Sequence, residues 1–323
     1  MLNELVFKDI SNPIRGYLER SDVYDLCINK PQEVYLLTAN GWEIHQAELI
    51  TEQWCKSFIQ ATSNYAAQTT DKNSPILSAE LLSGERIQAI IPPACRDISI
   101  TIRRPQSVLI PIKQYKDKGL LKKSRSKEII EKADVIEAKK LYDSVDSIEE
   151  CLEFCILNKL NIIFSGATGS GKTTIANTIS QFIPDNERLV TIEDSAEINL
   201  KQQNVVNLFY PRNKKNPVVT PDELLASCMR MSPSRIIFGE LRGAEAFFYI
   251  DQINTGHRGS ITTIHANSGR KALKRMVKLI KRSDEGKGFS SDELTEDLRE
   301  EIDVIFQWHS HGIDHAYFPA IED

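Results

Sequence analysis

The residues with the clearest chemistry lie in GATGSGKT, residues 166–173, which matches the pattern GxxxxGK[ST]. A predicted strand in NIIFSGA leads into the segment and a predicted helix over TTIANTISQFI follows it, which is the context that a phosphate-binding loop requires. Glycines let such a loop turn its amides inward, and the helix N-terminus adds partial positive charge. We expect phosphate to be held by Gly166, Gly169, Ser170, Gly171, Lys172, Thr173 and Thr174.

Cleavage of a bound triphosphate needs further groups. Lys172 is predicted to reach the β- and γ-phosphates, and the Thr173 hydroxyl to bind Mg²⁺. The strand RIIFGE ends in Glu240, and TIEDSAE places Glu193 and Asp194 at the end of another strand. Open α/β sheets bind ligands at the carboxyl ends of their strands. We therefore predict that Glu240 and Glu193 activate water and order the metal shell, with their separate roles left open; a structural cap is the alternative for either.

Two histidines occur in TGHRGSITTIHAN, residues 255–267. His257 and His265 could be metal ligands, a catalytic pair or packed core residues, because imidazole suits all three roles. Eight residues separate them and no cysteine lies near, which disfavours a zinc pair.

The elements that must position these residues follow from sequence periodicity. In the first third, EVYLLTA-NG-WEIHQAE predicts a hairpin with a type I′ turn at Asn40-Gly41, and residues 51–68 an amphipathic helix. ERIQAIIPP and DISITIRRP read as strands. From about residue 145, strands alternate with helices, which predicts a mainly parallel sheet covered on both faces. We expect a smaller α+β domain over 1–112, a charged, partly helical linker over 113–144 and an α/β domain over 145–323.

Composition limits the class of protein. The chain has 323 residues, a net charge of −5 and a sequence pI near 5.8, which argues against a general nucleic-acid coat. No apolar run approaches the roughly 18 residues of a membrane span, and the charged N-terminus MLNELVFKDISN does not resemble a signal peptide. We expect a cytoplasmic protein that can dock on a membrane surface. The six cysteines include no CxxC pair, which favours buried free thiols over structural zinc.

The order GATGSGKTT, TIEDSAEI, RIIFGELRG and TGHRGSITTIHAN resembles the Walker A, Asp box, Walker B and His box of the secretion-superfamily traffic ATPases. CINKPQEVYLL, SGERIQAIIPPAC and ISITIRRP further resemble the N-terminal domain of the type IV secretion branch, the family of the eleventh Vir-B component. The resemblance covers most of residues 20–309 and is weak in the first twenty residues and in the charged linker.

The resemblance implies a PAS-like N-terminal domain, a RecA-like P-loop ATPase motor domain and a ring of six subunits. ATP and Mg²⁺ would lie between the two domains of a protomer. His265 would sense the γ-phosphate and His257 order its loop, while Arg103 would reach the nucleotide, as would Arg230 and Arg242 beside the Walker B strand. The motor would act at the cytoplasmic face of the inner membrane with other type IV secretion components, and would power pilus assembly or substrate transfer.

Several alternatives stay open. Within the class, a type II secretion or type IV pilus ATPase is the rival, although the four-cysteine zinc insert usual in type II members is absent. A non-hydrolysing nucleotide-binding scaffold and a nucleic-acid motor are the others; we expect no sequence-specific nucleic-acid binding. HSHGIDH, residues 309–315, is interpreted as a hairpin turn rather than a metal site. The cationic linker and the basic helix over 269–283 are interpreted as solvated faces, with an anionic lipid or nucleic-acid contact as the alternative.

Overall fold

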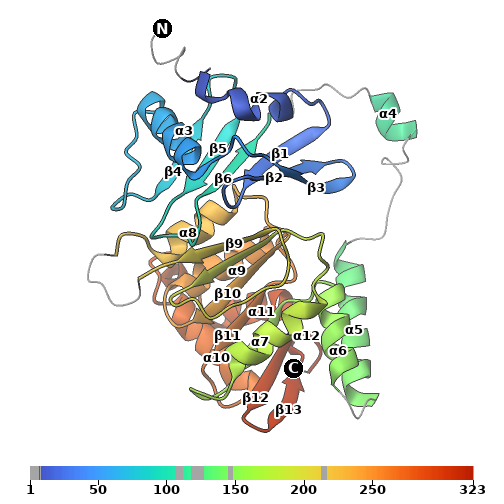
Figure 1. The fold of residues 1–323 in the computed structure, drawn as a ribbon. Helices are drawn as coiled ribbons and strands as arrows, with labels where there is room; N and C mark the ends of the chain where they lie inside the picture. The colour runs from blue at the N-terminus through green and yellow to red at the C-terminus, as the bar shows by residue number, and fades with distance from the viewer. Residues whose placement is uncertain are drawn as a thin grey trace.

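The computed structural model describes residues 7, 9–105, 112–117, 127–144, 148–211 and 217–322. Two sheets, each with its own helices, lie one above the other (Figure 1). The upper sheet belongs to the predicted N-terminal domain and the lower one to the predicted α/β domain. Most of the cationic part of the predicted linker, residues 118–126, lies outside the described residues.

The N-terminal unit is a six-stranded antiparallel sheet in the order β3-β2-β1-β6-β5-β4. Helix α3 packs on it as predicted, with Cys55, Phe58 and Ile59 buried, and Thr51 caps its first turn. The elements are α2 (Asn12–Leu18), β1 (Val23–Ile28), β2 (Glu33–Thr38), β3 (Gly41–Gln46), α3 (Glu52–Tyr65), β4 (Ile76–Glu80), β5 (Arg86–Ile90) and β6 (Ser99–Arg103).

The β2–β3 hairpin forms as predicted, but its turn is of a different type. Thr38 pairs with Gly41, so the loop consists of Ala39 and Asn40. A type I′ turn needs positive φ at both central residues, whereas here only Gly41 has one, at 102°. The prediction of a type I′ turn at Asn40-Gly41 was therefore wrong. The glycine after the loop takes up the left-handed conformation, so Asn40 does not have to.

The α/β domain contains a seven-stranded sheet in the order β13-β12-β7-β11-β10-β8-β9. Every neighbouring pair is parallel except β12 and β13. The α/β fold predicted from the alternating pattern is thus confirmed, and the HSHGIDH segment forms the turn between β12 and β13, as predicted. The strands are β7 (Ile162–Ser165), β8 (Leu189–Glu193), β9 (Val205–Phe209), β10 (Arg235–Leu241), β11 (Ile261–Ile264), β12 (Val304–His309) and β13 (Gly312–Tyr317).

Helices cover both faces of this sheet because successive strand residues point to opposite sides. Ile163 faces a core shared with α8, α9, α10 and α11, whereas Ile162 and Phe164 face a core shared with α5, α6 and α7. Helix α5, from the predicted linker, thus packs on the α/β domain, and α4 stands apart from it (Figure 1). The helices are α4 (Ile112–Asp117), α5 (Lys127–Ser144), α6 (Glu149–Leu157), α7 (Lys172–Ile179), η1 (Ser180–Phe182), α8 (Pro221–Cys228), α9 (Glu245–Asn254), α10 (Gly269–Ile280), η2 (Gly286–Gly288), α11 (Ser291–Glu301) and α12 (Pro319–Glu322).

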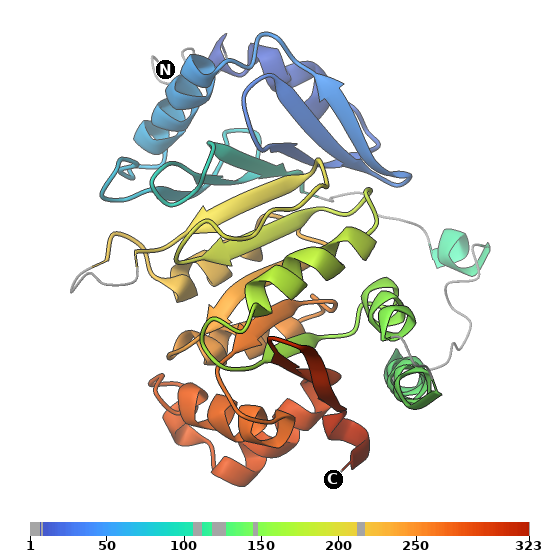
Figure 2. The same cartoon turned by 60° about the horizontal axis from the view of Figure 1, so that its bottom comes forward.

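The two units meet along β9, which lies directly beneath the N-terminal unit (Figure 2). The amide of Arg96 donates to the Asn207 carbonyl, and the amide of Phe209 donates to the Ala94 carbonyl, so the N-terminal unit extends the β9 edge of the seven-stranded sheet. Arg188, which is fully buried, donates from Nη1 to the side-chain oxygens of Asn29 and Asn204, 2.7 and 2.6 Å away. This guanidinium therefore links both domains.

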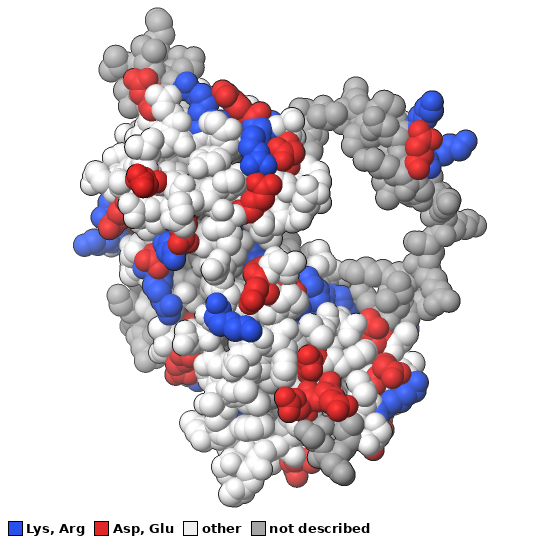
Figure 3. Space-filling model, turned by 45° about the vertical axis from the view of Figure 1, so that its right-hand side comes forward, with Lys and Arg blue, Asp and Glu red and all other residues white. Residues whose placement is uncertain are grey.

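Three further properties concern the surface charges, the length of the apolar helices and the cysteines. Acidic and basic side chains are interspersed on the face that Figure 3 shows. Within the part of the chain that the structure describes, no helix is long and apolar enough to cross a bilayer. All six cysteines are buried, as predicted.

Candidate nucleotide site

The predicted phosphate-binding loop connects β7 to α7 at the carboxyl edge of the parallel sheet. Gly169 and Gly171 have φ of 72° and 92°, in the left-handed region that favours glycine. Gly166 is needed for a different reason: a Cβ there would lie 2.4 Å from the carbonyl oxygen of Trp308. The loop can therefore keep this path only with glycine at these three positions.

Trp308 supports the loop and was missed by the sequence analysis. Its Nε1 donates to the Ser170 carbonyl at 2.7 Å, and its own carbonyl lies against Gly166. Trp308 lies at the end of β12, 138 positions away from Ser170 in the chain. No local motif marks it, because only the pairing of β12 with β7 brings it to the loop.

Lys172 lies at the start of α7 with only 6% of its surface exposed. Its Nζ donates to the carbonyls of Gly166 and Ala167, 3.1 and 2.8 Å away, and lies 3.2 Å from His265 Nδ1. Burial lowers the pKa of this ammonium, and the charge of Glu240 acts in the opposite direction. A buried cation whose hydrogen-bond partners are all neutral is suited to an anion, since a phosphate would supply the missing negative charge.

His265 lies between Lys172 of the loop and Glu240 of β10. Its Nε2 lies 2.9 Å from Glu240 Oε1, while Nδ1 faces Lys172 and the Gly166 carbonyl, at 3.2 Å each. A ring without a proton on Nδ1 accepts from Lys172 Nζ at that atom, and a ring with Nδ1–H donates to the Gly166 carbonyl instead. The imidazole therefore contacts both the loop and the Glu240 carboxylate.

Glu240 continues this chain of contacts through Arg242. The Arg242 guanidinium pairs with Glu240 Oε2 and, through Nη1, with Asp194 Oδ2 at 3.2 Å. Lys172, His265, Glu240, Arg242 and Asp194 thus form one continuous network, built from the Walker A, His-box, Walker B and Asp-box segments. Four motifs far apart in sequence converge at one edge of the sheet.

Glu193 is placed differently. Its side chain is 2% exposed, and Oε2 accepts hydrogen bonds from the amides of Glu197 and Ile198, at 2.7 Å each. Thr191 Oγ1 donates to the other oxygen at 3.1 Å. Burial raises the pKa of Glu193, and the two amides oppose that shift. The carboxylate therefore caps the loop that follows β8, the structural alternative kept open for it above, while its neighbour Asp194 faces Arg242.

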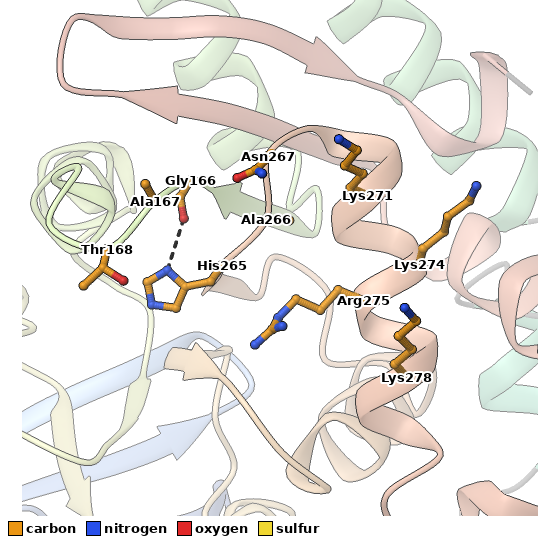
Figure 4. Close-up of a pocket in the computed structure, with 10 residues that line it drawn as sticks. All are labelled: Gly166, Ala167, Thr168, His265, Ala266, Asn267, Lys271, Lys274, Arg275 and Lys278. Carbon is orange, nitrogen blue, oxygen red and sulfur yellow. Dashed lines mark hydrogen bonds between the residues drawn. The ribbon is translucent and has the colours of Figure 1, made fainter.

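A pocket of about 510 Å³ opens beside the loop. The carbonyl of Gly166 faces His265 across it, and Arg275 reaches toward the same space from α10 (Figure 4). No acidic side chain is among the residues that line it: Gly166, Ala167, Thr168, His265, Ala266, Asn267, Lys271, Lys274, Arg275 and Lys278. The glycine turns, the buried Lys172 and this cationic lining fit a triphosphate. Thr173 at the first turn of α7 and Glu240 are the oxygen donors that would hold Mg²⁺ there.

Arg103, the arginine predicted to reach the nucleotide from the N-terminal domain, lies elsewhere in the chain. Arg103 pairs with Asp25 at 2.9 Å and donates to Ser232 Oγ at 2.8 Å. It lines a cavity of about 280 Å³ together with Arg230 and Arg86. Arg86, which the sequence analysis quoted in SGERIQ but did not select, thus joins two predicted arginines.

This cavity lies away from the phosphate-binding loop. Ser232, to which Arg103 donates, precedes β10, whereas the loop follows β7. Because β10, β11 and β7 are parallel, Ser232 lies at the end of the sheet where these strands begin, and the loop lies at the end where they finish. Arg103 is also absent from the residues that line the loop pocket. Within the chain, the structure brings Arg103 and Arg230 together and keeps them apart from Lys172.

His257 also lies at the end of the sheet where the parallel strands begin, since it precedes β11, whereas His265 follows β11. Burial lowers the pKa of His257, and a hydrogen bond with the Pro233 carbonyl opposes the shift. His257 and His265, which flank β11, therefore lie at opposite ends of this strand. Within the chain, His257 does not line the pocket that His265 lines.

The lowered pKa of His257 makes a prediction about stability. The folded state favours the neutral ring, so stability is present above the ordinary pKa of 6.5 and is lost as the pH falls below it. We expect this residue to cost at most about 1.4 kcal/mol at pH 5.5 relative to pH 7.5. His257→Gln, measured by urea unfolding at both pH values, should lose less stability on acidification than the wild type. An unchanged difference would show that another group dominates.

Comparisons with known proteins agree with this geometry. The family model described as "Type II/IV secretion system protein" matches residues 125–307. The type IV secretion system protein VirB11 of Bartonella quintana (strain Toulouse) is 35% identical over 311 residues, covering 91% of this chain and 86% of the relative. The type IV secretion system protein PtlH of Bordetella pertussis (strain Tohama I) is 33% identical over 271 residues, covering 82% and 78%.

One solved structure is similar over nearly the whole chain. It is the VirB11 ATPase from the Brucella suis type IV secretion system, crystallised in complex with sulphate. The TM-score is 0.88 at 32% identity, and the match covers 97% of each chain. A nearly complete structural match requires that both domains and their arrangement be similar, which supports the two-domain fold implied by the sequence motifs. The chain therefore belongs to the type II/IV secretion system protein family, as an ATPase of its type IV secretion branch that is similar to VirB11.

Proposed function

We propose that this chain is a Mg-ATP-hydrolysing motor that works as a homo-hexamer at the cytoplasmic face of the inner membrane and powers type IV secretion. The observation that carries the proposal is the network from Lys172 through His265 to Glu240, beside a glycine loop that fits a triphosphate. These groups are those that phosphoryl transfer needs: a cation on the phosphates, a carboxylate near the terminal phosphate and a side chain that connects the two.

The geometry supports separate roles for the two glutamates. Glu240 faces the loop through His265 and would orient the attacking water, while Arg242 holds its second oxygen. Glu193, bound to two amides, would support the loop after β8 rather than contact the metal directly. Mg²⁺, when bound, neutralises charge on the phosphate oxygens. His265 would sense the γ-phosphate because it lies between Lys172 and Glu240.

The position of Arg103 supports a site shared between protomers. A head-to-tail ring contact joins two different surfaces of neighbouring subunits. The arginine cavity lies where the parallel strands begin, and the loop pocket lies where they end. A head-to-tail contact can therefore place the arginine cavity of one subunit against the loop pocket of the next. We therefore place Arg103, with Arg86 and Arg230, on the nucleotide of the neighbouring protomer rather than on that of its own.

Mixing two inactive variants tests this sharing. Lys172→Ala lacks a working loop but keeps Arg103, whereas Arg103→Ala has the opposite defect. If the arginine acts on a neighbour, an equimolar mixture, combined as monomers and then assembled with nucleotide, contains complete sites and should recover roughly a quarter of wild-type ATP turnover, as random pairing of two halves gives. Arg15→Ala, which removes an exposed arginine of the same domain away from the domain contact, serves as the control. No recovery in the mixture would place Arg103 on its own protomer's nucleotide.

The proposed function as a whole is tested by measuring the mass of the protein in solution, with and without a non-hydrolysable nucleotide, together with phosphate release. A hexamer that hydrolyses ATP is the expected result. A protein that binds nucleotide without turnover would be a scaffold instead. A rate that rises with added DNA and falls with salt would indicate a nucleic-acid motor.

A further inference from the structure

The turn that joins β10 to α9 is held by side chains from two directions. Glu245, the first residue of α9, accepts hydrogen bonds at Oε1 from the amides of Arg242 and Gly243, at 2.7 Å each. Arg282, just beyond the end of α10, donates from Nη1 to the Arg242 carbonyl at 3.0 Å. The amide and the carbonyl of Arg242 are thus each fixed by a side chain from another part of the domain.

These contacts matter because the strand that leads into the turn is irregular. The pairing of β10 with β8 ends at Phe238. Between the pairs that Phe238 and Leu241 form with β11, β10 contains one residue more than its partner strand. A bulge of this kind changes the direction of the side chains around it. Glu240 lies inside the bulge and Arg242 follows it, so regular strand pairing does not fix where these two side chains point.

The turn positions the guanidinium of Arg242. This group contacts Glu240 Oε2 and, through Nη1, Asp194 Oδ2 at 3.2 Å. Glu240 is the carboxylate that would orient the attacking water, so the direction of this carboxylate depends on where the guanidinium lies. A displacement of about 1 Å at a reacting centre can lower a rate by about 100-fold. A small movement of the turn would therefore be enough to slow the reaction.

The surroundings of Glu245 fit a residue that acts on the main chain. Glu245 is absent from the described residues that line the loop pocket. Burial raises the pKa of Glu245, and hydrogen bonds from its own amide and from that of Gly243 oppose the shift. Bonds between a carboxylate and backbone amides are about twice as strong as those between neutral groups, and the first turn of a helix favours negative charge. Glu245 is therefore a strong anchor for the amides that it binds.

We propose that Glu245 is a positioning residue for ATP hydrolysis, because it fixes the turn that directs the Arg242 guanidinium to Glu240. The inference rests on the proposed function, since Glu240 orients water only if the chain hydrolyses ATP. Glu245 touches neither the nucleotide nor the water, and its effect on the reaction passes through Arg242.

Two substitutions of Glu245 provide the first test. Glu245→Ala removes both acceptor bonds, and we expect kcat to fall on the order of 10- to 100-fold. KM for ATP and binding of a fluorescent nucleotide should stay unchanged, since Lys172 and the loop keep their contacts. Glu245→Gln keeps an oxygen that can accept both amide bonds and should turn over within about five-fold of the wild type. An unchanged kcat in the alanine variant would overturn the proposal, and so would a glutamine variant as slow as the alanine variant.

A double-mutant cycle shows whether Glu245 acts through Arg242. If the guanidinium is what the turn positions, Glu245→Ala has nothing further to disturb in a protein that already carries Arg242→Ala. We expect the double variant to match Arg242→Ala in its rate of single-turnover phosphate release. Losses that multiply in the double variant would show that Glu245 acts by another route, which would contradict the proposal.

Glu293 offers a matched control for the loss of helix stability. Its carboxylate accepts from the Ser290 amide at 2.7 Å at the start of α11, so Glu293→Ala also removes a carboxylate from the first turn of a helix. Both alanine variants should unfold about 2–4 °C below the wild type, whereas only Glu245→Ala should lose turnover. An equal loss of turnover in Glu293→Ala would attribute the effect to stability and overturn the positioning role. A wild-type protein without ATP turnover would count against the proposed function itself, whereas normal turnover by Glu245→Ala would count against this inference alone.

Discussion

Replacing Lys172 with alanine is expected to lower ATP turnover by about 1000-fold or more, which is the upper range for removal of one preorganised charge-stabilising group. Lys172 is buried, and its ammonium lies within 3.2 Å of His265 Nδ1, so no other side chain can take its position without rebuilding the loop. The loss should appear in kcat, because charge on the transferring phosphoryl group is greatest in the transition state. Phosphate release by the purified protein measures it.

A matched substitution distinguishes this effect from general damage. Lys201→Ala removes an exposed lysine of the same domain and should leave turnover unchanged. Thermal unfolding should show that Lys172→Ala still folds, because the variant loses a buried charge together with its hydrogen bonds to two carbonyls of its own loop. Full turnover by a folded Lys172→Ala protein would refute the nucleotide site.

Substitution of Glu240 by glutamine is expected to lower turnover by roughly 100- to 10,000-fold while nucleotide binding is kept, as for loss of a positioned acid or base. Glutamine retains the size of the side chain, but it cannot carry the negative charge that orients water. Single-turnover kinetics combined with binding of a fluorescent nucleotide separate the two steps.

The structure also predicts that Glu193→Gln behaves differently. The Glu193 carboxylate accepts from two amides at Oε2 and from one hydroxyl at Oε1, and a glutamine oxygen in the place of Oε2 can still accept both amide bonds. We expect turnover to change by less than about ten-fold, since the side chain caps a loop and does not face Lys172. A larger fall for Glu193→Gln than for Glu240→Gln would reverse the roles that we propose for the two residues.

The phosphate-binding loop could be located from sequence because its chemistry is local. Eight consecutive residues contain the turn glycines, the lysine and the helix start, and the flanking apolar segments identify the strand and the helix. The capping box that forms at Thr220 and Glu223 is local in the same way, since its residues lie within one helical turn. The alternation of strands and helices likewise fixed a parallel sheet, because parallel strands need crossover connections.

What the sequence could not decide was the direction in which equivalent side chains point. Glu193 and Asp194 are adjacent, yet the backbone after β8 turns the first toward two amides and the second toward Arg242. His257 precedes β11 and His265 follows it. Only the parallel pairing of β11 with β7 shows that the His265 end of the strand lies at the loop. Arg103 was predicted to reach the nucleotide, but the N-terminal unit packs along β9 and places Arg103 at the end of the sheet where the parallel strands begin, away from the loop.

By itself, then, the sequence determined where the glycine loop, here called the cradle, forms and which domain contains it, because those properties depend on residues that are neighbours in the chain. Only the tertiary structure decided that Trp308 supports the cradle, that Glu240 rather than Glu193 faces it, and that the arginines of the N-terminal unit lie elsewhere. These properties depend on contacts between residues that are not neighbours in the chain, such as Trp308 and Ser170, 138 positions apart, and such contacts are fixed by strand order and domain packing.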